Sequence, residues 1–304
     1  MNNSVTLAEQ LRKANDILSP AEKRIARVFL AHYPVAGLES VHRLAEKSNV
    51  SPPTVLRLFS RLGIGSYPEM QKMLRDEIAA RTSSPLEMYG ARLPPSTDAT
   101  GLAFVADSRR VLTQGLEATF ESISESEVLE TARLLANPRR RIWTLGGRFS
   151  DLLAQYLTIH LQLLRKDVAH VGQLEHNRTF ALMDFGPKDV IIAFDYRRYQ
   201  DSTIEFLSHA KQSKATTVLF TDPWLSPAAR HADHVLSCSV KASSPFDSLA
   251  SAFALVETVI AGVVEELGEA PRKRIEAFDE LQEGAFKFSS LEVEENDPTP
   301  HQRS

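Results

Sequence analysis

The sequence predicts an N-terminal all-α helix-turn-helix bundle followed by a C-terminal α/β domain with a parallel sheet. Three observations support this plan. Residues 1–81 carry the signals of several short helices, residues 82–101 are rich in Pro, Gly, Ser and Thr, and from residue 141 short β-branched segments alternate with helices. Such alternation is typical of a parallel sheet covered on both faces. At 304 residues the chain is long enough for two hydrophobic cores.

The domain boundaries follow from these changes in composition. We expect a helical domain over residues 1–81, a linker over 82–101 and an α/β domain over 102–288. Residues 289–304 are acidic and contain two prolines, so they bury little apolar surface and are expected to form a disordered tail.

Charge and cysteine content indicate the kind of partner and compartment. Residues 1–82 carry 12 Lys and Arg against 8 Asp and Glu, whereas the remainder carries 23 against 31. A basic N-terminal segment favours a polyanionic partner, although a mildly basic solvated helix face gives the same excess. The single cysteine, Cys238, excludes an intramolecular disulfide and a Cys-based zinc site, and we interpret it as a core residue. We expect a cytoplasmic protein.

No segment predicts a membrane partner. The first 18 residues interleave charges with apolar residues, unlike a signal peptide. The most apolar segment, residues 249–264, is shorter than the ~20 residues that cross a bilayer and contains Glu257, so we expect a buried helix there.

The basic segment contains the elements of a helix-turn-helix. Ser19 and Pro20 begin one helix, a second begins near Ser40, and Asn49 then suits the left-handed backbone of a tight turn. Ser51 is expected to cap a third helix. Two short helices joined by such a turn are typical of DNA-binding proteins.

The third helix has one apolar face and one polar face. Its apolar residues recur at helical spacing from Val55 to Leu62, which turns Thr54, Arg57 and Arg61 outward. Arginine forks onto base edges or phosphate, and the helix N-terminus favours an anion. We therefore predict that double-stranded DNA is contacted by Ser51, Pro53, Thr54, Arg57 and Arg61. A helical bundle with a solvated arginine face is the alternative.

The same residues resemble a known family. The segments Leu44-Ala45, Asn49-Val50-Ser51, Thr54-Val55, Arg57, Arg61-Leu62-Gly63 and Tyr67-Pro68-Glu69 resemble the N-terminal domain of RpiR-type transcriptional regulators. The resemblance covers nearly all of residues 5–80, and it implies sequence-specific DNA binding.

The C-terminal segment alternates helices and strands. A helix is expected over residues 102–120 and another after the capping box Ser124 to Glu127. Strands are predicted at residues 141–145, 167–171, 190–194, 216–220 and 234–237, with helices near 151–164, 175–183, 201–212 and 248–267.

Loops at the carboxyl ends of these strands are expected to form a ligand crevice. The first loop, from Gly146 and Gly147 through Arg148 to Ser150, leads directly into a helix, whose free N–H groups and dipole favour an anion. A tight structural turn is the alternative.

Two further strands end in candidate ligand residues. Arg197 and Arg198 follow the third strand, and Thr221 ends the fourth. The arginines can bind phosphate or carboxylate; alternatively they pair with Asp195 or Asp201 or support a subunit interface.

This order of elements resembles the SIS domain, a sugar-isomerase type of phosphosugar-binding module, from about residue 127 to 267. Gly146, Ser150 and Ala154 match its first phosphate loop, whereas Arg148 replaces a usual glycine. The family's Ser-x-Ser-Gly-x-Thr loop is aligned with Asp195, Arg197, Arg198 and Gln200. The resemblance implies an anionic sugar derivative, and the departures favour a carboxylate or a differently placed phosphate.

The favoured function is a transcription factor that responds to a small anionic metabolite, a sugar phosphate or sugar acid, and that binds its operator as a homodimer or higher oligomer. Helices over 102–120 and 249–264 are candidates for the interface. No metal is predicted, because His231 and His234 lack helical metal-ligand spacing. No catalytic residue or cofactor is predicted either, since the serine-rich anchor of the isomerases is missing and an N-terminal DNA-binding segment has no role in isomerisation. The alternatives are a sugar-phosphate isomerase, with Glu175, His176 or Glu257 as base, and a regulator without ligand response.

Overall fold

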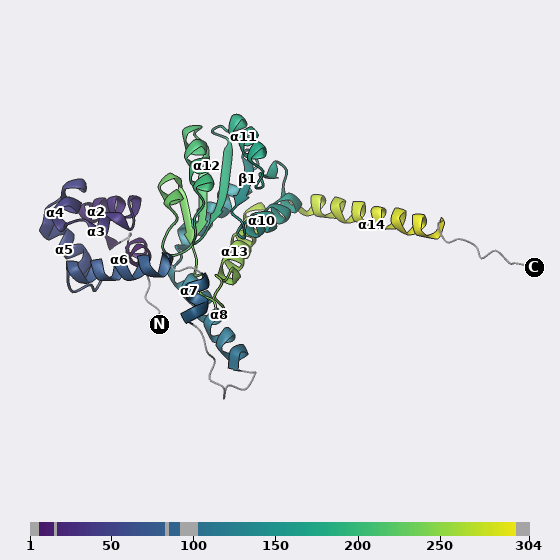
Figure 1. Cartoon of the computed structure of the whole chain (residues 1–304). Helices are drawn as coiled ribbons and strands as arrows, with labels where there is room; N and C mark the ends of the chain where they lie inside the picture. Colours follow the sequence, from purple (N-terminus) through teal and green to yellow (C-terminus); the bar gives the residue numbers. More distant parts are fainter. Residues whose placement is uncertain (1–5, 15–16, 83–84, 92–102, 296–304) are drawn as a thin grey trace, which may run out of the picture.

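The computed structural model describes residues 6–14, 17–82, 85–91 and 103–295. Within these ranges the chain forms a helical N-terminal domain and a C-terminal α/β domain (Figure 1). This is the fold class that the sequence predicts. None of the described helices is both long enough and apolar enough to cross a membrane.

The N-terminal domain packs its helices around one apolar core. The helices are α1 (Leu7–Lys13), α2 (Pro20–Ala31), α3 (Val35–Leu38), α4 (Val41–Lys47), α5 (Pro52–Arg61) and α6 (Tyr67–Thr82). Fully or almost fully buried side chains from five of them meet in the core: Leu11, Phe29, Leu44, Phe59 and Leu74. Their burial supplies most of the favourable free energy of this domain, because short helices are unstable alone.

The turn between α4 and α5 has the predicted backbone but a different cap. Asn49 has a φ of 51°, the left-handed conformation expected of it. Ser51 occupies the N-cap position, yet its side chain accepts no backbone hydrogen bond; its Oγ lies 2.9 Å from Thr54 Oγ1. The predicted cap is wrong because Pro52 and Pro53 have no N–H to donate, and Thr54 N donates to the Ser51 carbonyl instead.

The C-terminal domain is built on a parallel sheet. Its strands are β1 (Arg141–Gly146), β2 (Val168–His170), β3 (Asp189–Asp195), β4 (Thr216–Thr221) and β5 (His234–Ser237), in the spatial order β2-β1-β3-β4-β5. Every neighbouring pair is parallel. The carboxyl ends of the strands therefore lie at one edge, as the sequence analysis expects.

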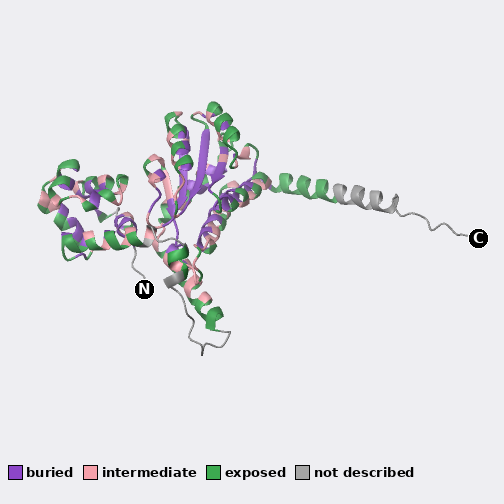
Figure 2. Cartoon of the chain, viewed as in Figure 1, coloured by how far each residue is buried: buried purple, intermediate pink, exposed green. Residues whose placement is uncertain are grey.

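Helices cover both faces of the sheet. One face packs against α9 (Glu125–Ala136), α10 (Asp151–Leu164) and α13 (Ala250–Leu267), and the other against α11 (Glu175–Asp184), α12 (Asp201–Gln212) and the 3-10 helix η2 (Pro227–His231). Figure 2 shows the strands buried between these layers. Cys238 is fully buried, which confirms it as a core residue, and burial raises its pKa to about 12.

Two helices, α7 (Pro85–Ala91) and α14 (Arg272–Glu295), are not expected from sequence, whereas α8 (Ala103–Ser122) is. Helix α7 lies inside the predicted linker, whose residues 92–101 are outside the described part, and α8 follows. Helix α14 projects away from the sheet (Figure 1). Residues 289–295 are thus part of a helix, where the sequence predicts the start of a disordered tail. Residues 296–304 lie outside the described part.

Candidate DNA interface and ligand crevice

Helix α5 presents the side chains that the sequence predicts for DNA. Val55, Leu58 and Phe59 are buried in the core. On the opposite face Arg57 is exposed and bends over the first turn of its own helix: its Nη2 lies 3.4 Å from Thr54 Oγ1, and its Nε donates to the Pro53 carbonyl at 3.4 Å. Together with Ser51, these side chains form a compact polar cluster at the N-terminal end of α5.

Arg61 lies apart from this cluster. Its Nη1 donates to the Ile17 carbonyl at 3.2 Å and lies 3.4 Å from Glu22 Oε2, so its half-exposed side chain joins α5 to the start of α2. Burial acts to raise the pKa of Glu22, but hydrogen bonds from Ser19 and the charge of Arg61 hold that pKa below its usual value. The geometry gives Arg61 a structural contact that its sequence position alone does not reveal.

The first strand-end loop is held by its own hydrogen bonds. The Gly147 N–H donates to Ser150 Oγ at 2.8 Å, and the Ser150 hydroxyl donates to the Phe194 carbonyl at 2.7 Å. The Gly147 N–H is therefore already used within the turn, because the buried serine accepts it. A Cβ at Gly146 would lie 2.4 Å from the Asp151 nitrogen, so the tight turn requires glycine there.

The third strand-end loop carries an arginine pair bound to an aspartate that precedes α13. Arg197 Nε donates to Asp247 Oδ2 at 3.2 Å, and its Nη2 also donates to this carboxylate. Arg198, at a φ of 72°, donates from Nη2 to the same Oδ2 at 3.3 Å. The structure thus pairs the arginines with Asp247 and not with Asp195 or Asp201, the partners considered from sequence.

Two buried aspartates lie at the same sheet edge. Asp195 accepts hydrogen bonds from the Ser226 hydroxyl and from Gln200 N, and burial raises its pKa to about 6. Asp222 accepts from the Tyr199 hydroxyl at 2.7 Å, and burial raises its pKa to about 7. Both therefore bind a proton more readily than an exposed aspartate does.

The remaining predicted ligand residues divide into one surface residue and several structural ones. Thr221 is fully buried; its hydroxyl donates to the Asp195 carbonyl at 2.7 Å and accepts from Ser226 N at 3.1 Å. Arg148 is exposed beside Gly147. A Cβ on Gly147 would lie 3.1 Å from Gln200 Cδ, which places the first and third loops side by side, as the parallel topology requires.

The residues weighed for other chemistry lie on separate elements, and two of them, Glu257 and His234, have side-chain partners. Glu175 and His176 open α11, while Glu257 accepts a hydrogen bond from Tyr156 at 3.1 Å, between α13 and α10. His234 Nδ1 lies 3.1 Å from Glu127 Oε2. Within the described ranges no three His, Cys, Asp or Glu side chains form a group suited to a metal ion.

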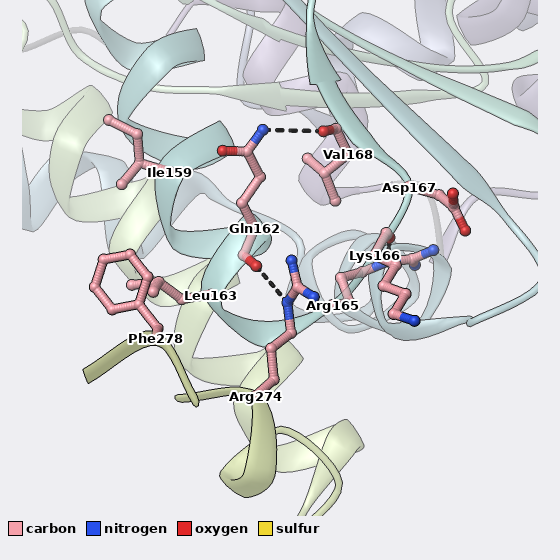
Figure 3. Close-up of a pocket in the computed structure, with 9 residues that line it drawn as sticks. All are labelled: Ile159, Gln162, Leu163, Arg165, Lys166, Asp167, Val168, Arg274 and Phe278. Carbon is pink, nitrogen blue, oxygen red and sulfur yellow. Dashed lines mark hydrogen bonds between the residues drawn. The ribbon is translucent and has the colours of Figure 1, made fainter. Parts of the chain in front are cut away.

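A cavity at the opposite edge of the sheet was not expected from sequence. It measures about 340 Å³ and lies between the end of α10, the start of β2 and the first turns of α14 (Figure 3). Arg274 Nε donates to the Gln162 carbonyl at 2.6 Å, and Gln162 Nε2 donates to the Val168 carbonyl at 3.1 Å. The cavity depends on α14, a helix that the sequence analysis does not include.

A helix-turn-helix bundle followed by a parallel α/β domain defines the chain as a two-domain helix-turn-helix protein. Residues 5–81 match the family model described as a helix-turn-helix domain of the rpiR family, and residues 134–262 match the SIS domain. The chain therefore belongs to the RpiR family of helix-turn-helix regulators that carry a C-terminal SIS domain.

The relatives are similar at low identity. An uncharacterized HTH-type transcriptional regulator of Caldanaerobacter subterraneus is 22% identical over 224 residues, which cover 73% of this chain and 76% of the relative. HexR, an HTH-type transcriptional regulator of Pseudomonas aeruginosa, is 30% identical over 156 residues, which cover 51% of this chain and 46% of HexR. The matched region is thus about half of HexR.

One solved structure supports the fold of the C-terminal domain. The sugar isomerase domain of an RpiR transcription factor from Sphaerobacter thermophilus has a TM-score of 0.53 and 22% identity, covering 58% of this chain and 98% of that domain. At this identity the similarity shows the fold alone.

Proposed function

We propose that the protein is a sequence-specific DNA-binding transcriptional regulator whose SIS domain senses a small anionic metabolite, a sugar phosphate or a sugar acid. The observation that carries this proposal is the polar cluster of Ser51, Thr54 and Arg57 on the outward face of α5, in a chain that also holds arginines at the carboxyl edge of the sheet. Sequence-specific binding to an operator requires side chains such as those of the polar cluster. A response to an anionic metabolite requires cationic side chains such as the arginines.

The DNA interface is the outward face of α5. Arg57 and Thr54 would reach base edges in the major groove, while Ser51 and Pro53 lie against the backbone of the duplex. Arg61 would hold α5 against α2 through its ion pair with Glu22. Because its side chain is half exposed, it would also add to the positive potential that attracts phosphate.

The ligand site is the edge formed by the first and third loops. Arg148 and Arg198 have exposed or half-exposed guanidinium groups that can fork onto a phosphate or carboxylate. Arg197 is almost fully buried and would hold Asp247 and the shape of the loop. Gly146, Gly147, Ser150 and Thr221 would position these loops through the contacts described above.

Operator binding implies a homodimer or higher oligomer, since a single helix-turn-helix buries little surface. Exposed apolar side chains that support an interface lie on α8 and α13: Phe104, Val105, Phe120 and Val264. Such a regulator would act in the cytoplasm, where the chromosomal operator is located.

Two experiments on the full chain test the proposal. Selection from random duplexes followed by a gel shift should yield a defined operator, and failure to enrich any sequence would refute the DNA-binding function. A thermal-shift screen of sugar phosphates and sugar acids should raise the melting temperature, because a ligand that binds only the folded state stabilises it. Turnover of an aldose phosphate without operator binding would support the isomerase alternative instead.

A further inference from the structure

The last helix of the DNA-binding domain ends against the third strand-end loop of the SIS domain (Figure 1). The Arg81 guanidinium carbon lies 4.5 Å from the centroid of the Tyr199 ring, within the range of a cation–π contact. Tyr199 in turn donates its hydroxyl to Asp222. One side chain of α6 thus contacts the loop that contains Arg197 and Arg198.

The surroundings of Arg81 are acidic. Asp195 and Asp222 are 2% and 0% exposed, and their burial disfavours the charged form. The charge of Arg81 acts in the opposite direction on both and offsets part of this effect, although burial still raises their pKa values to about 6 and about 7. A cation supplied by the other domain therefore stabilises two buried carboxylates, so the two domains are coupled electrostatically.

Other contacts continue the same interface. Met88 Sδ, on α7, lies 3.0 Å from Arg197 Nη2. Thr6 Oγ1 donates to the Pro223 carbonyl at 3.0 Å, directly after Asp222, and Arg12 Nη1 donates to the Val235 carbonyl on β5 at 3.3 Å. The DNA-binding domain and α7 thus touch the segments that follow β3 and β4 and the edge strand β5.

We propose that Arg81 is a latch: by stacking on Tyr199, near the buried Asp195 and Asp222, it docks the DNA-binding domain on the ligand edge of the SIS domain. Because Arg197, Arg198 and Tyr199 are consecutive, a movement of the arginines toward an anion also moves the ring beneath Arg81. A ligand at this edge therefore releases α6. The role of the ligand rests on the proposed function; the docking contact does not.

Hydrogen exchange of the full-length protein tests the latch. Arg81→Gln should speed amide exchange in both α6 and the loop 195–200, by the same factor between about twofold and thirtyfold, the range expected for loss of a cation–π contact. Arg75→Gln, an exposed arginine on the same helix, is the matched control and should leave both segments unchanged. Equal exchange in the Arg81 and Arg75 variants would overturn the latch.

A double-mutant cycle isolates the contact from general destabilisation. If Arg81 acts through Tyr199, adding Tyr199→Leu to Arg81→Gln should speed exchange in α6 no further than either change alone. Additive effects of the two substitutions would show that the residues act independently, and would overturn the proposal even if one variant folds poorly.

Inorganic phosphate separates the latch from the proposed ligand site. At millimolar concentration it should raise the melting temperature of the wild type and speed exchange in α6 as Arg81→Gln does. If phosphate does not change the melting temperature, the result counts against the anion site. The comparison of the Arg81→Gln and Arg75→Gln variants then still tests the docking contact. A melting shift with unchanged exchange in α6 would overturn the release step.

Discussion

Arg197 and Asp247 are 50 residues apart in sequence, yet Arg197 Nε donates to Asp247 Oδ2 at 3.2 Å. The pair joins the loop after β3 to the segment before α13, and Arg198 reaches the same carboxylate. One carboxylate therefore offsets part of the positive charge of this arginine pair.

Asp247→Asn is expected to tighten anion binding. The amide oxygen can still accept from the arginines, but the negative charge that competes with the ligand is lost. We expect an affinity gain of about threefold to tenfold at low salt, decreasing as salt is added. Calorimetric titration of both proteins with the best ligand from the screen measures it, and weaker binding by the variant would show that the charge of Asp247 positions the site rather than competing with the ligand.

Removing an arginine should have the opposite effect. Arg148→Ala and Arg197→Ala are expected to abolish the metabolite response while operator affinity without ligand stays unchanged, because the residues proposed to contact DNA lie on α5. Calorimetry and gel shifts on the same preparations separate the two activities. If both variants bind the ligand as tightly as wild type, the arginines are structural and the site lies elsewhere.

Arg57→Ala should cost about 1–3 kcal/mol of specific DNA affinity. The side chain is exposed and contacts only its own helix in the contacts described above, so its removal should leave the fold intact. A gel-shift titration at fixed salt measures the loss, with Arg272→Ala on α14 as a control that removes an exposed arginine far from α5. Unchanged affinity and base preference would remove Arg57 from the interface.

Glu77 should make stability depend on pH. This half-buried carboxylate accepts a hydrogen bond from Leu7 N at 3.0 Å and another from the Tyr33 hydroxyl. Burial raises its pKa to about 7, from 4.5 in the unfolded chain. The folded state therefore holds the proton more tightly, so the contribution of Glu77 to stability decreases as pH rises from about 4.5 to 7 and then stays constant.

Glu77→Gln should remove this dependence, because the amide is neutral at every pH and its oxygen can still accept. We expect the free energy of unfolding of the variant, measured by urea titration, to exceed that of wild type by about 1–3 kcal/mol at pH 8. At pH 4.5 the two proteins should have nearly the same free energy of unfolding. A difference that is equal at both pH values would show that Glu77 does not titrate in this range.

Light scattering at micromolar concentration should give at least twice the chain mass of 33.8 kDa. If α8 contributes to the interface, Phe120→Asp should shift the mass toward the monomer, because a charge replaces an apolar side chain that is 48% exposed in the single chain. A monomer in the wild type, even with operator present, would contradict the proposed mode of DNA binding.

The sequence predicts elements better than contacts. Strands β1 and β4 begin at their predicted residues, because β-branched runs bounded by turns report burial directly. The outward face of α5 follows in the same way from helical periodicity. The pairing of Arg197 with Asp247 and the approach of Arg81 to Tyr199 depend on how distant segments pack, and no local pattern encodes them. Helix α14 is not predicted: residues 272–288 are assigned to the α/β domain without a helix, and only residues 289–295 of it are assigned to the acidic tail.

The two prolines at the start of α5 limit which groups of this helix are available to bind DNA phosphate. Most helices offer several backbone amides to a phosphate at their first turn, but here Pro52 and Pro53 have none, and Thr54 N already donates to Ser51. Attraction to the duplex must then come from charged side chains, each of which displaces a condensed counterion. Binding strength would accordingly track ionic strength closely, and the cell's salt balance would help set how long the protein stays on its site.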